Sequence, residues 1–151
     1  MNPKQKSALS KIFAISGSLF LWAPILFMLV GAIWGSIQSK SVLFDYFTLA
    51  ELFPIVALGL VLLVLASLVS RTFARWFGWG SVAALVALSG GQIFASVSGL
   101  ASGALAPTGS AVAIVIVSTV VFDLVIVGLA VLGIVLIRRL FRRPEPAAQQ
   151  D

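Results

Sequence analysis

The 151-residue sequence contains no cysteine and no histidine. Without cysteine there is no disulfide, no thiolate metal site and no cysteine nucleophile, and cysteine usage gives no sign of the redox compartment. Without histidine, the commonest general base and the commonest metal ligand are missing. The sequence also lacks a phosphate-binding glycine loop and any serine–histidine–aspartate or serine–lysine constellation. We therefore expect no enzymatic activity, no metal and no cofactor.

Charged residues are scarce as well. They make up 10% of the chain, whereas 60% is hydrophobic and the mean hydropathy is +1.13. Soluble globular domains carry about 25% charged residues, so this composition predicts an integral membrane protein whose solvent is the lipid bilayer. The formal net charge is +5, but the basic residues fall in short clusters beside apolar runs. This distribution does not predict a nucleic-acid partner.

Four apolar runs are each long enough to cross a bilayer, which takes roughly 20 residues. They cover residues 12–37, 50–69, 76–100 and 111–137. Because the segments between them are short, consecutive helices should be antiparallel neighbours. The sequence thus predicts an all-α membrane domain over 12–137, with four helices in an up-down-up-down bundle. Residues 1–11 form a basic N-terminal segment that we expect to remain uncleaved, and 138–151 a basic and then disordered tail.

Lysine and arginine are concentrated on one predicted side of the bundle. Nine of the ten precede the first span, separate the second from the third, or follow the fourth: Lys4, Lys6, Lys11, Arg71, Arg75, Arg138, Arg139, Arg142 and Arg143. Only Lys40 lies in a loop on the opposite side. Short basic segments are retained in the cytoplasm, so both termini are predicted to be cytoplasmic, in the plasma membrane of a prokaryote.

The end of the first span resembles the end of the third. Residues 31–37, GAIWGSI, align with residues 91–97, GQIFASV, with an identical or similar residue at most positions. An internal repeat would make the fold two tandem helical hairpins in the same orientation. Apolar helices use few residue types, so chance alignment explains the same observation, and both interpretations stay open.

Small residues recur every four positions in these same two spans. The series are Gly31 and Gly35 in the first span, and Gly91, Ala95, Gly99 and Gly103 from the third span into its loop. In lipid, helices associate through close backbone contact, which small residues at this spacing allow. We expect these stripes to pack against another helix, either of the same chain, of a second copy or of a partner protein.

An acidic residue, Asp123, lies inside the fourth apolar run. It precedes Arg138 by fifteen residues, which places it about 22 Å from the cytoplasmic boundary. Inserting an aspartate at the centre of a membrane helix costs about 2.5 to 3.5 kcal/mol. We therefore expect Asp123 to be turned away from lipid, and to be protonated because no basic residue lies within the apolar part of a span.

Three other polar residues are candidates to share a ligand or ion site with Asp123. Thr119 lies one turn away on the same helical face, and Glu51 lies at the external end of the second span at a comparable depth. Gln92 in the third span is expected to reach the bundle interior. The alternative is that Asp123 only forms an internal hydrogen bond, and that Glu51 only complements the helix dipole.

Two functions remain after these exclusions. The first is a small non-enzymatic membrane protein with a structural or accessory role, which binds a membrane partner or forms a homo-oligomer. The second is a small transporter, ion pathway or ligand-binding bundle that uses Asp123 with Glu51. A transporter usually has a second polar group or a broken helix near the midplane. The chain offers little of either, so the sequence favours the first function.

Overall fold

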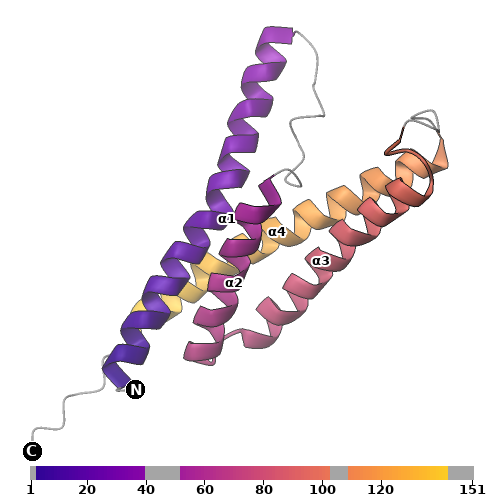
Figure 1. Cartoon of the computed structure of the whole chain (residues 1–151). Coiled ribbons are helices and arrows are strands. Elements are labelled where there is room, and N and C mark those ends of the chain that lie inside the picture. Colours follow the sequence, from indigo (N-terminus) through magenta and orange to yellow (C-terminus); the bar gives the residue numbers. More distant parts are fainter. Residues whose placement is uncertain (1–2, 40–51, 103–108, 143–151) are drawn as a thin grey trace, which may run out of the picture.

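The computed structural model describes residues 3–39, 52–102 and 109–142. Four helices account for nearly all of these residues (Figure 1): α1 (Pro3–Ser39), α2 (Phe53–Ser70), α3 (Ala74–Val97) and α4 (Ser110–Arg142). The prediction of an all-helical chain is confirmed, and all four helices are long and apolar enough to cross a membrane. Glu51, Lys40, Gly103 and Arg143 lie outside the described residues.

The helices match the four predicted apolar runs but differ from them at the ends. The α1 helix begins at Pro3 rather than residue 12, and α4 continues to Arg142 rather than 137. Lysine and arginine are good helix formers, so the basic flanks extend both helices beyond their apolar parts. The α3 helix ends at Val97, before residue 100, because Gly99 adopts a left-handed φ of +80° and terminates it. Gly99 is therefore a helix-ending residue, and its place in a packing stripe stays a prediction.

The four helices are arranged as two packed pairs that meet at one end. Contact is most extensive between α1 and α2 and between α3 and α4, and α1 also packs on α4. Figure 1 shows the C-terminal half of α1 extending past α2, while α3 and α4 lean away from it. The buried core includes Leu21, Leu63, Phe77, Phe122 and Ile126, which come from all four helices.

The backbones of α1 and α2 come close together at Gly17 and Gly59. A Cβ atom built on Gly17 would lie 2.9 Å from the carbonyl oxygen of Gly59 and 2.9 Å from the backbone nitrogen of Leu63. Only glycine allows backbones to come this close. About two helical turns before Gly17, Ser10 Oγ donates a hydrogen bond to the carbonyl of Ala66 at 3.2 Å. This bond joins the same two helices a second time.

The predicted glycine stripes account for only part of this packing. Gly91 does pack on α4, since a Cβ there would lie 2.9 Å from Ser118 Oγ. Gly31 and Gly35 border a depression of about 240 Å³ whose described lining comes from α1. That these two glycines pack against another helix stays a prediction.

We predict that Gly17→Ala destabilises the protein by about 1–3 kcal/mol, because the added methyl group meets fixed backbone atoms of α2. The matched control is Gly128→Ala in α4, where nothing lies within 4 Å of the added atom. There the exchange should be neutral or stabilising by up to about 1 kcal/mol. The free energy of unfolding, measured by denaturant titration in micelles, compares the two. Equal effects would contradict the close contact of α1 with α2.

Candidate functional site

Asp123 lies in α4 beside two fully buried residues, Phe122 and Ile126. Its side chain is half-buried, and its carboxyl oxygen Oδ1 is shielded from solvent. It is the only acidic residue within the three described ranges. The structure therefore places the one described carboxyl group partly inside the helix packing.

The structure describes two of the three residues predicted to share a site with Asp123. The Thr119 hydroxyl donates a hydrogen bond to the carbonyl of Val115 in its own helix at 3.0 Å. Gln92 is exposed on α3, whereas we expected it to reach the interior. Glu51 lies outside the described residues. A shared ligand or ion site at Asp123 therefore stays a prediction.

Ser118, which sequence reasoning did not single out, makes the polar contact between α3 and α4. Its hydroxyl donates a hydrogen bond to the carbonyl of Ala87, next to the close contact with Gly91. Ser118 precedes Phe122 by four residues and so continues the buried face of α4. The spacing of four residues between Ser118 and Phe122 is a sequence signal that places the two side chains on one face of α4.

Two further polar atoms are buried without a hydrogen-bond partner among the described residues: Trp22 Nε1 and Ser81 Oγ. Ser81 belongs to the lining of an apolar depression of about 220 Å³ between α2 and α3, together with Leu60 and Leu85. These groups are singly placed on different helices, so they do not add up to a catalytic or metal-binding arrangement.

The α3 helix has one buried side and one polar, outward side. Its buried residues are Phe77, Ala84 and Gly91. Ser89, Gln92 and Ser96, which follow one another at intervals of three and four residues, are all exposed on the opposite side. Val82 and Ile93 are exposed apolar side chains on the same side of the helix. We call the residues 82, 89, 92, 93 and 96 the outer face of α3.

Comparison with protein-family models, with curated proteins and with solved structures gives no match to this chain. The function is therefore argued from the residues and their geometry.

We predict that Ser118→Ala lowers the free energy of unfolding by about 0.5–1.5 kcal/mol, because it removes a hydrogen bond between two helices. The neighbouring exchange Thr119→Val removes a hydroxyl that bonds only within α4, and should change stability by less than about 0.5 kcal/mol. Denaturant titration of both variants in the same micelles makes the comparison. A larger loss for Thr119→Val would mean that its hydroxyl has an interhelical role.

Proposed function

We propose that this chain is a non-enzymatic, multi-pass protein of a prokaryotic plasma membrane, which acts as a structural or accessory subunit by binding another membrane helix. Four helices long and apolar enough to span a bilayer support the location. The observation that carries the function is the outer face of α3, where polar side chains point away from the rest of the chain.

The proposed topology is up-down-up-down with both termini in the cytoplasm. Contacts between the basic segments support it. Lys11 Nζ lies 5.2 Å from the ring centre of Phe141, and the Arg139 guanidinium lies 4.6 Å from that of Phe73. These contacts bring the first turns of α1, the turn between α2 and α3 and the last turns of α4 to the same end (Figure 1). By the positive-inside rule, the end of a membrane protein that carries the basic segments lies in the cytoplasm.

The orientation is testable because the chain has no native cysteine. We predict that a membrane-impermeant maleimide added to intact cells labels Ser110→Cys, at the start of α4, and does not label Gln5→Cys, near the start of α1. Permeabilised cells should show labelling of both variants. Labelling of Gln5→Cys before permeabilisation would reverse the proposed orientation.

The outer face of α3 is unfavourable in contact with lipid alone. The Ser96 hydroxyl is satisfied by the carbonyl of Gln92 at 2.9 Å, but the Gln92 side chain presents an amide to its surroundings, and polar groups in membrane helices normally bond to a neighbouring helix. The primary amide both donates and accepts hydrogen bonds, so Gln92 can pair with a polar group of either kind on a second helix. A partner helix would cover both the amide and the serines beside it.

We predict that single cysteines on the outer face of α3, Ser89→Cys or Ser96→Cys, form disulfide adducts under mild oxidation in membranes. Val117→Cys and Val120→Cys are the controls, because these positions are exposed on α4. Adducts of twice the chain's mass, also formed by purified reconstituted protein, identify the partner as a second copy. Adducts of another mass, formed only in native membranes, identify a different protein. Cross-linking no greater than in the controls would overturn the proposal.

The contribution of the amide is measured separately. Gln92→Leu should weaken the same association roughly 5- to 30-fold, because hydrogen bonds between membrane helices contribute about 1–2 kcal/mol in model peptides. The association is followed as the fraction cross-linked at decreasing protein-to-lipid ratio.

An ion or solute pathway through Asp123 is the second candidate function, supported by the half-buried position of its carboxyl group in a membrane-length helix. It ranks lower because Gln92, a second polar residue expected at that site, is exposed on α3 rather than directed into the bundle. Solute or ion flux in proteoliposomes that is lost in Asp123→Asn would favour it over the accessory role.

A further inference from the structure

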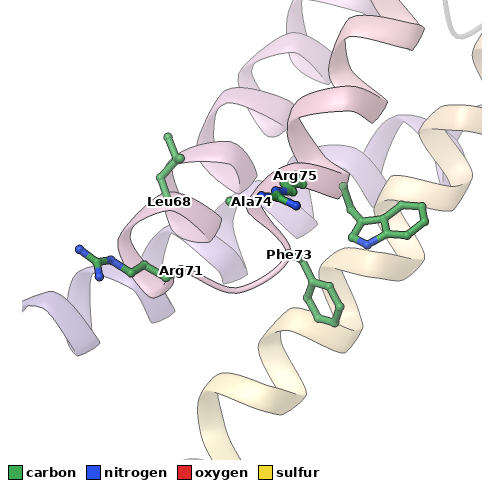
Figure 2. Close-up of a pocket in the computed structure, with 6 residues that line it drawn as sticks. Leu68, Arg71, Phe73, Ala74 and Arg75 are labelled. Carbon is green, nitrogen blue, oxygen red and sulfur yellow. The ribbon is translucent and has the colours of Figure 1, made fainter.

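The turn that joins α2 to α3 borders an open depression of about 610 Å³ (Figure 2). Its described lining is Leu68, Arg71, Phe73, Ala74, Arg75 and Trp76. The depression lies at the basic end of the molecule, where α1 begins and α4 ends (Figure 1). The outer face of α3 is not part of it.

The charge of the depression is positive and has no described counter-charge close by. Arg71 and Arg75 are both exposed. Asp123, the only described acidic residue, lies in α4 about 22 Å along the helix from Arg138. Two guanidinium groups without a carboxylate partner are suited to bind an anion, and their planar donor geometry matches the oxygens of a phosphate group.

The backbone of the turn adds to this positive charge. The α3 helix begins at Ala74, and Phe73 before it provides no side-chain cap for the first-turn N–H groups. The positive end of the α3 dipole therefore lies at the same place as the two arginines.

Several contacts fix the turn in place. The N–H of Thr72 donates to the carbonyl of Ser67 at 3.1 Å, and that of Arg71 to the carbonyl of Leu68 at 3.3 Å. On the other side, the guanidinium of Arg139 covers the ring of Phe73 at 4.6 Å. Arg139 thus ties the turn to α4 and leaves Arg71 and Arg75 for a ligand.

Two apolar side chains of the lining, Leu68 and Trp76, are exposed. The Leu68 side chain is 57% exposed and that of Trp76 is 71% exposed, and tryptophan is enriched at the level of lipid headgroups. A small soluble anion would use the arginines but would leave these two side chains uncovered. A phosphate carrying acyl chains would contact both kinds of lining at once.

We infer that this depression binds the phosphate headgroup of an anionic phospholipid, with Arg75 beside the phosphate, Arg71 adding positive charge at the rim, and Leu68 and Trp76 against the upper acyl chains. The inference rests on the membrane location proposed above and is independent of the partner helix. Its ligand class is a phosphate monoester or diester anchored in the bilayer.

The test measures phosphatidylglycerol retained by the full-length protein, by native mass spectrometry after reconstitution with phosphatidylcholine containing increasing phosphatidylglycerol. At about fivefold in affinity for each arginine that contacts the retained lipid, Arg71→Gln/Arg75→Gln should weaken binding roughly 25-fold. The control is Arg138→Gln/Arg142→Gln, which removes the same charge at the same end of the molecule, but from residues of α4 outside the described lining of the depression. Because the measurement counts lipid that stays bound to the extracted protein, the control should lose fivefold or less.

Two further comparisons identify the ligand. Trp76→Ala should weaken phosphatidylglycerol binding, whereas Trp79→Ala, which is equally exposed at 75% but does not line the depression, should not. Inorganic phosphate at millimolar concentration should leave the bound lipid in place. Equal losses in the two arginine pairs would overturn the site, and displacement by inorganic phosphate would overturn its assignment to lipid. Helix content and unfolding of every variant are compared with the parent, so that a folding defect is recognised. Failure of this test leaves the α3 cross-linking result unaffected.

Discussion

The contact between Gly17 and Gly59 is the constraint on which the rest of the packing depends. It brings the backbones of α1 and α2 so close that a single methyl group on Gly17 would meet fixed atoms of α2. This approach holds Leu63 at the centre of the joined helices, where it also lies next to Gly133 of α4. One backbone contact thereby sets the position of three helices. In a bilayer, where no hydrophobic force drives one helix against another, such contacts have to supply the association energy.

A few hydroxyl groups add interhelical hydrogen bonds to this packing. Ser10 reaches the carbonyl of Ala66 across the pair α1 and α2, and Ser118 reaches the carbonyl of Ala87 across α3 and α4. Each pair therefore has a described hydroxyl that bonds between its two helices. The polar surface available for recognition lies on the outward side of α3 and at the basic turn between α2 and α3.

The sequence predicted the four helices well because hydropathy reports which solvent a segment prefers, and lipid leaves a helix as almost its only option. It predicted their ends poorly, since the basic flanks of α1 and α4 stay helical beyond the apolar runs. Pairwise geometry was harder still. Gly17 and Gly59, where α1 and α2 come close together, belong to no repeated spacing of small residues. Likewise Thr119 is adjacent to Asp123 on its helix, but its hydroxyl bonds to Val115. Which faces of two helices meet depends on both helices together. Neither the spacing of glycines nor the spacing of polar residues within one helix specifies that pairing.

The unequal lengths of the first two helices have a consequence for the bilayer itself. The α2 helix has 18 residues and α1 has 37, which correspond to about 27 Å and about 55 Å of helix. A hydrocarbon core is about 30 Å thick, so α2 spans it only when nearly upright or when the bilayer thins around it. The apolar part of α1, residues 12–37, corresponds to about 39 Å of helix, because the basic first turns lie outside it. In a bilayer α1 would therefore be too long and α2 slightly too short for the same thickness, and the contact at Gly17 would keep either helix from adjusting its tilt alone.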